Sequence, residues 1–91
     1  MTENRLLIGS LSNDLNRIAN LAYRGNEKAA CKFWEESKKW IYDLKNHSNK
    51  PYIAKIIADL EQSKFNPRDL AQAEKNLMYS IILQNYALHI V

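Results

Sequence analysis

Cysteine is scarce in this chain: the 91 residues include only one, Cys31. A single thiol cannot close an intramolecular disulfide, and it cannot begin a zinc site built on several cysteines. Small secreted domains usually depend on disulfides, so a chain of this size without them is more typical of a reducing compartment. We therefore expect a cytoplasmic protein. We expect Cys31 to be an incidental surface thiol, because no histidine accompanies it in the sequence as a base.

Glycine and proline are nearly as scarce, with two of each. A β-sandwich or small barrel needs a special turn residue about every ten positions, so this composition argues against an all-β fold. Because Gly9 and Gly25 are the only glycines, a glycine-rich phosphate-binding loop is excluded as well.

The chain also lacks a long hydrophobic run. Its longest apolar stretch, residues 80–91, contains Gln84, Asn85 and His89 and is shorter than the roughly 20 residues that cross a bilayer. The first 20 residues are interrupted by charged and amide side chains and lack the pattern of a signal peptide. We expect no insertion into a membrane.

What is present fits one small globular domain. Hydrophobic residues make up 46% of the chain, which at this length is enough for one core and too little for two. The 13 basic and 10 acidic side chains leave a net charge of +3. This mild bias is compatible with an acidic partner but does not indicate one. We predict a single helical domain over residues 1–91.

Three short polar breaks divide the chain into four segments. Gly25 suits the end of one helix, and Asn26 suits the N-cap of the next. Residues 46–51 form a second polar break, whose last residue is a proline suited to a first helical turn. The third break repeats this arrangement. There we expect Asn66 to cap a helix that begins at Pro67 and runs to the last residue.

The apolar residues of each segment recur every three or four positions, as in an amphipathic helix. The first helix is predicted to begin between Glu3 and Leu11. The side chains predicted to face inward are Leu7, Leu11, Leu15, Ile18 and Ala22 in the first segment; Ala30, Phe33, Ser37, Trp40, Ile41 and Leu44 in the second; Ile53, Ile56, Ile57 and Leu60 in the third; and Leu70, Ala73, Leu77, Ile81, Gln84 and Leu88 in the fourth. Amphipathic helices with short connections most simply pack as antiparallel neighbours. We therefore predict an all-α fold, a small antiparallel (up-and-down) bundle of four helices.

Residue patterns for catalysis or metal binding are missing. Nothing in their chain positions places His47 and His89 together. A di-metal site in a helical bundle needs Glu-x-x-His pairs, and the sequence has none. The paired carboxylates Glu35 and Glu36 are neighbours on a helix, so they diverge by about 100° and do not share a site. We expect no enzyme, no cofactor and no metal.

Positive charge gathers where the second predicted helix meets the polar break. This basic patch consists of Lys38, Lys39, Lys45 and Lys50. With Trp34 and Tyr42 on the same helix, it has the composition of a phosphate-binding surface. However, Glu35, Glu36 and Asp43 are interspersed, and no row of base-reading side chains accompanies it. A solvated helix end is the simpler interpretation, and a nucleic-acid-associated regulatory protein is the alternative function.

The fourth predicted helix carries a second apolar stripe opposite its predicted inward face. This candidate interface consists of Tyr79, Ile82, Leu83, Tyr86 and Ile90. A surface helix needs only one apolar face, so either this helix is central to the fold or its second face binds a partner. Tyrosine is typical of interfaces. We therefore predict a small helical protein–protein interaction module without catalytic activity, which forms a homodimer through its C-terminal helix or docks on another protein.

Overall fold

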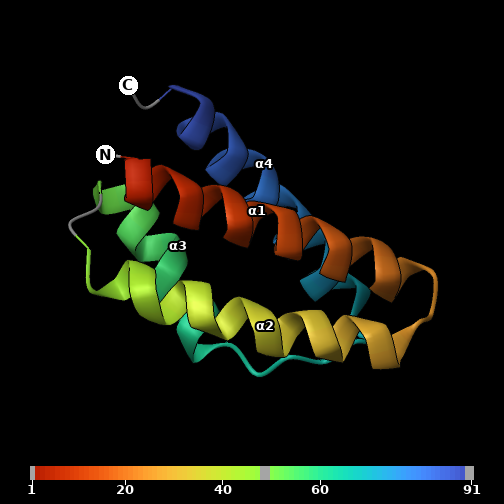
Figure 1. The fold of residues 1–91 in the computed structure, drawn as a ribbon. Coiled ribbons are helices and arrows are strands. Elements are labelled where there is room, and N and C mark those ends of the chain that lie inside the picture. The colour runs from red at the N-terminus through yellow and green to blue at the C-terminus, as the bar shows by residue number, and fades with distance from the viewer. Residues whose placement is uncertain (1, 48–49, 90–91) are drawn as a thin grey trace.

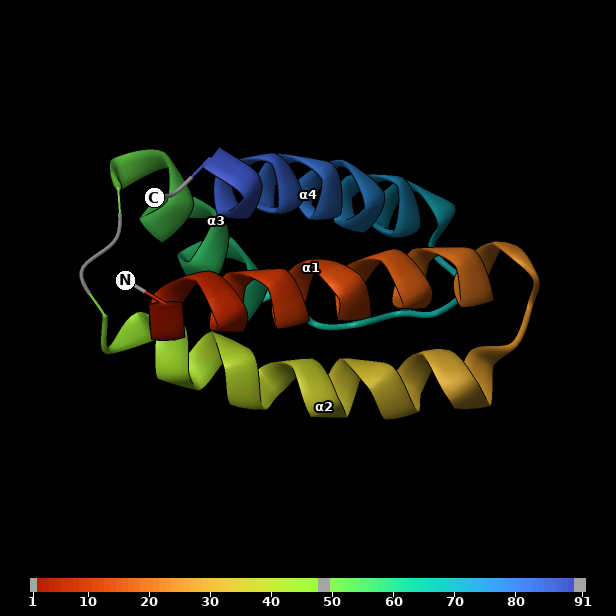
Figure 2. The same ribbon diagram turned by 45° about the horizontal axis from the view of Figure 1, so that its top comes forward.

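The computed structural model describes residues 2–47 and 50–89. These residues form four α-helices, which are α1 (Thr2–Tyr23), α2 (Glu27–Lys45), α3 (Pro51–Gln62) and α4 (Leu70–His89) (Figure 1). Helix α1 lies between α2 and α4 and runs antiparallel to both of them (Figure 2). The shorter α3 contacts α2 and lies obliquely across one side of these three helices (Figure 1). The predicted all-α bundle of four helices is confirmed.

The turn between α1 and α2 follows the sequence prediction. Gly25 has a φ of 77°, a left-handed conformation that glycine adopts without strain. Its N–H donates to the carbonyl of Ala22, and the N–H of Asn26 donates to the carbonyl of Leu21, which is the hydrogen-bond pattern of a Schellman motif. The Asn26 side chain then accepts a hydrogen bond from the N–H of Ala29 and caps α2. Both local predictions are therefore confirmed.

The predicted start of the fourth helix is wrong. Residues 66–69 form a hydrogen-bonded turn, in which the N–H of Asp69 donates to the carbonyl of Asn66 at 3.1 Å. Pro67 occupies the second position of this turn, where its fixed φ is favourable. The helix begins at Leu70, and Asp69 Oδ1 accepts hydrogen bonds from the N–H groups of the second and third helical residues. Asp69 is thus the N-cap. The predicted end of this helix, at residues 90–91, lies outside the described residues.

The core is built around α1. The largest fully buried apolar side chains of the core are Ile8, Leu11, Leu15, Ile18, Leu44, Ile53 and Leu83. The inward faces predicted for α1 and α3 are buried, except that Leu7 is only half-buried. In α2, Trp34 is buried, whereas Phe33 and Trp40 are half-buried. Trp34 turns inward because its ring stacks on that of Phe65, in the segment that leads to α4, with 4.9 Å between ring centroids.

One carboxylate lies in the contact between α1 and α2, which the sequence pattern did not indicate. Asp14 is 3% exposed, and its Oδ2 accepts a hydrogen bond from Trp40 Nε1 at 2.8 Å. Arg17 Nη1 lies 3.8 Å from the other oxygen. Burial raises the pKa of the Asp14 carboxyl above its ordinary value, and the hydrogen bond from Trp40 partly opposes that shift.

Candidate interaction surface

Small side chains dominate the buried face of α4. The residues of α4 that are buried are Ala73, Asn76, Ser80, Leu83 and Ala87. Small residues let the backbones of neighbouring helices approach closely. The approach to α1 is close enough for Ser12 Oγ to donate a hydrogen bond to the backbone carbonyl of Ser80 at 2.7 Å. The contact with α1 therefore buries the face of α4 that has mostly small side chains.

The inward face predicted for α4 lies mostly on its outer side. Leu70 is 55% exposed, Ile81 53% and Leu88 61%. Gln84 is also exposed and Leu77 is half-buried, so that Ala73 is the one residue of the predicted face that is buried. The prediction is wrong because helical spacing shows which residues share a face and does not show which face is buried. The packing of α4 on α1 requires a face of small residues.

The residues of the candidate interface belong largely to the core of the chain itself. Leu83 has no exposed surface, and Tyr79, Ile82 and Tyr86 are partly buried against the core. The Tyr86 ring meets that of Tyr52 in α3 edge to face, with 5.8 Å between centroids. Ile90 lies outside the described residues. Within the described part of the helix, this face contacts the rest of the domain and presents no free apolar patch.

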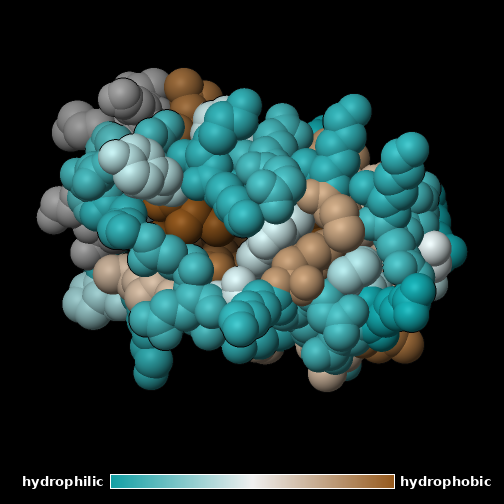
Figure 3. All heavy atoms as spheres, turned by 90° about the horizontal axis from the view of Figure 1, so that it is seen from below, coloured by the Kyte–Doolittle hydropathy of each residue, from teal (hydrophilic) through white to brown (hydrophobic). Residues whose placement is uncertain are grey.

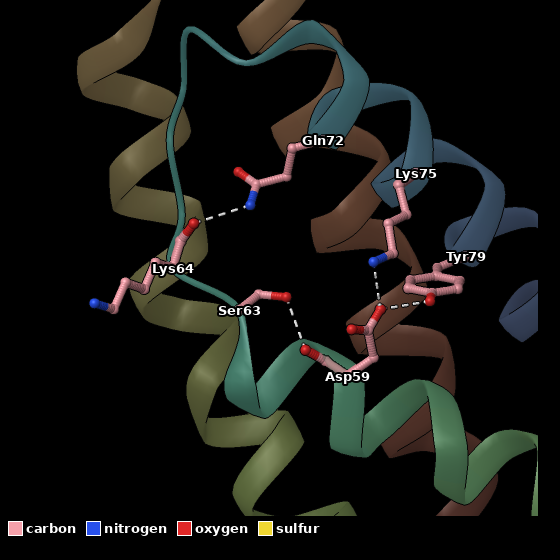
Figure 4. A network of polar contacts seen from close by, with 6 residues as sticks. All are labelled: Asp59, Ser63, Lys64, Gln72, Lys75 and Tyr79. Carbon is pink, nitrogen blue, oxygen red and sulfur yellow. Dashed lines mark hydrogen bonds and ion pairs between the residues drawn. The ribbon is translucent and has the colours of Figure 1, made fainter.

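The phenol of Tyr79 takes part in a polar network that links α3 to α4 (Figure 4). Asp59 Oδ2 accepts a hydrogen bond from the Tyr79 hydroxyl at 2.5 Å and an ion-paired one from Lys75 Nζ at 2.7 Å. The hydrogen bonds from Lys75 and Tyr79 lower the pKa of Asp59. Burial, followed by the hydrogen bond to Asp59, raises the pKa of Tyr79 to about 12. Gln72 Nε2 also donates to the carbonyl of Lys64 (Figure 4), so the network holds the connecting segment in place.

The outer side of α4 carries an apolar surface that the domain leaves uncovered. We call Leu70, Leu77, Ile81 and Leu88 the outward stripe. With Glu74 and Gln84, these positions alternate in steps of four and three, which is the spacing of a coiled-coil seam. Exposed Met78 borders the stripe. The outward stripe thus has the spacing of one side of a helix–helix contact.

Helix α1 extends this surface at one end. Leu6 is 66% exposed, and with Leu88 it lines a hollow of about 320 Å³ between α1 and α4. The other lining residues are Arg5, Gly9, Ser10, Asn13, Gln84 and Ala87. Among these only Arg5 is charged. The outward stripe itself is apolar, and the seam that contains it includes one charged side chain, Glu74.

The basic patch is partly neutralised by carboxylates. Lys38 pairs with Glu35 at 3.0 Å, and Lys45 pairs with Glu61 of α3. The hydrogen bond to Glu61 raises the pKa of Lys45. Lys39 and Lys50 are exposed. The face seen from below in the view of Figure 1 is mostly hydrophilic, with hydrophobic side chains in small areas between (Figure 3). The basic patch therefore resembles an ordinary solvated surface, and none of these contacts favours a nucleic-acid site.

Groups with catalytic potential are dispersed. His47 Nδ1 lies 2.8 Å from the carbonyl of Asp43, and His89 Nδ1 lies 2.7 Å from that of Asn85. Cys31 is exposed. Within residues 2–47 and 50–89, no group of three or more histidine, cysteine, aspartate or glutamate side chains is placed to hold a metal ion. In the same residues, no helix combines the length and hydrophobicity needed to span a membrane.

No family model, curated protein or solved structure matches this chain.

Proposed function

We propose that this protein is a small, non-catalytic protein–protein interaction module that docks through the outward stripe of α4. One observation carries the proposal: α4 buries mostly small residues beside Leu83 and leaves Leu70, Ile81 and Leu88 more than half exposed. Exposing these side chains to water is unfavourable unless another surface covers them. Self-association through the C-terminal helix then uses the outward stripe, not the Tyr79 side of the helix.

A pair of charge-introducing variants separates the two faces of α4. Ile81 is 53% exposed, so Ile81→Asp should retain the helical circular dichroism of the wild type. Leu83 is fully buried, so Leu83→Asp places an unpaired charge in the core and should unfold the domain, at a cost of several kcal/mol. The opposite pattern would contradict the assignment of the faces.

The function itself is tested by comparing what the folded variants bind. Ala54 is exposed on α3, so Ala54→Asp adds the same charge away from the outward stripe. Tagged wild-type protein is mixed with extract of its native host, and its self-association is measured alongside. We expect Ile81→Asp to lose associations that Ala54→Asp retains. If Ile81→Asp associates with itself and with other proteins as the wild type does, the outward stripe is not a docking surface.

A further inference from the structure

The spacing of residues in the outward stripe is the same from either end of the helix. Its members are separated by seven, four and seven positions, so the pattern is symmetric about position 79. This spacing suits a two-fold interface of antiparallel helices, because each member of the stripe then lies opposite another member in the second copy. An antiparallel pair of α4 helices with the axis at position 79 would place Leu70 opposite Leu88 of the second copy. Leu77 would lie opposite Ile81.

From this symmetry we infer that the occupant of the outward stripe is a second copy of the chain, bound with its α4 antiparallel to the first. The inference rests on the proposed function, since it names the partner of the same surface. It goes further by specifying the orientation and the register of the two helices.

Charge selects the antiparallel orientation. Glu74 and Gln84 both belong to the seam and lie five positions on either side of the midpoint. In the antiparallel pair, each Glu74 carboxylate meets a Gln84 amide, which can donate a hydrogen bond to it. A parallel, in-register pair would instead bring the two Glu74 carboxylates together, and like charges at such a seam repel.

The hollow beside Leu88 fits the same arrangement. Leu70 of the second copy arrives next to Leu88, where Leu6 and Ala87 supply apolar walls and the hollow measures about 320 Å³. Leu70 is itself 55% exposed. The antiparallel pair therefore brings an exposed leucine to a hollow at each end of the interface, and α1 contributes Leu6 to it.

The exposed apolar area is at the lower limit for a specific dimer. Leu6, Leu70, Met78, Ile81 and Leu88 are each more than half exposed, which amounts to on the order of 500 Å² of apolar surface per copy. Two copies together would bury on the order of 1,000 Å² from these side chains, the lower limit of a specific interface. Met78 lies one position from the axis and meets its own counterpart there.

Sedimentation velocity over a wide range of protein concentrations tests the dimer. We expect the wild type and the Ala54→Asp control to dimerise, and Leu70→Asp to remain monomeric with unchanged helical content. A wild type that is monomeric at all concentrations overturns the dimer. In that case the proposed function still stands if Ile81→Asp loses another protein that Ala54→Asp retains, so the two failures are distinguishable.

Gln84→Lys tests the orientation. In the antiparallel pair, each new lysine faces a Glu74 carboxylate, and the two resulting ion pairs should tighten the dimer about three- to tenfold. Adding Glu74→Gln to this variant should abolish the gain. In a parallel pair, the two lysines would face each other and weaken the dimer. A weaker or unchanged dimer of Gln84→Lys therefore overturns the antiparallel register.

Discussion

At the scale of single residues, Asp14 shows how a charged group is retained in a small core. Its carboxylate accepts the indole N–H of the half-buried Trp40. Asp14→Ala removes the acceptor and should lower the free energy of unfolding by about 1 kcal/mol. Asp14→Asn keeps an oxygen that can accept this bond, so it should cost less. Urea unfolding of both variants checks the order, and equal losses would mean that the hydrogen bond contributes nothing.

The difference in stability between Asp14→Asn and the wild type should depend on pH. Burial raises the pKa of Asp14 in the folded state, so its effect on stability is most favourable below the unfolded pKa, where the carboxyl is neutral. That contribution is lost as pH rises through the folded pKa. The stability of Asp14→Asn relative to the wild type should therefore increase between acidic and neutral pH. A relative stability that falls over this interval would contradict the raised pKa.

At the scale of the element, substitutions at the N-cap of α4 distinguish the observed start of the helix from the predicted start. Asp69→Ala removes the acceptor for two helical N–H groups and should cost about 1 kcal/mol of unfolding free energy. Asp69→Asn should retain most of the stability, because asparagine caps as well. Asn66→Ala is the matched comparison, since Asn66 would be the cap if the helix began at Pro67. A larger loss for Asn66→Ala than for Asp69→Ala in urea unfolding would contradict the observed start.

At the scale of the whole molecule, the arrangement of the helices predicts where the domain opens first. Helix α1 is covered by α2 on one side and α4 on the other, whereas the backbone of α3 lies mainly near α2 and its contacts with α4 are made by long side chains. Amides of well-covered elements exchange only in global unfolding, while peripheral elements open locally. Native-state hydrogen exchange should therefore find the slowest amides in α1 and faster ones in α3. Equal protection of the two helices would indicate that the domain opens only as one unit.

Particular residues show which parts of the structure could be predicted from the sequence. Gly25 and Asn26 terminate and cap helices through bonds to residues a few positions away, and such local interactions can be read from the order of residues. Asn66 and Asp69 are both good caps, and the prediction took Asn66 because Pro67 follows it, whereas Asp69 caps the helix. Nothing in the pattern marked Asp14 as buried, because its partner Trp40 is 26 positions away.

The sequence by itself determined the four helices and the apolar character of both faces of α4. It also contains the symmetric spacing of the outward stripe, a spacing that is equally typical of a buried face. Only the tertiary structure decided which face of α4 is buried. The physical reason is that the choice depends on the fit between α4 and α1, where Ser12 and Ser80 bring the helices close. Hydrophobicity drives burial, but the shape of the neighbouring helix determines which residues are covered.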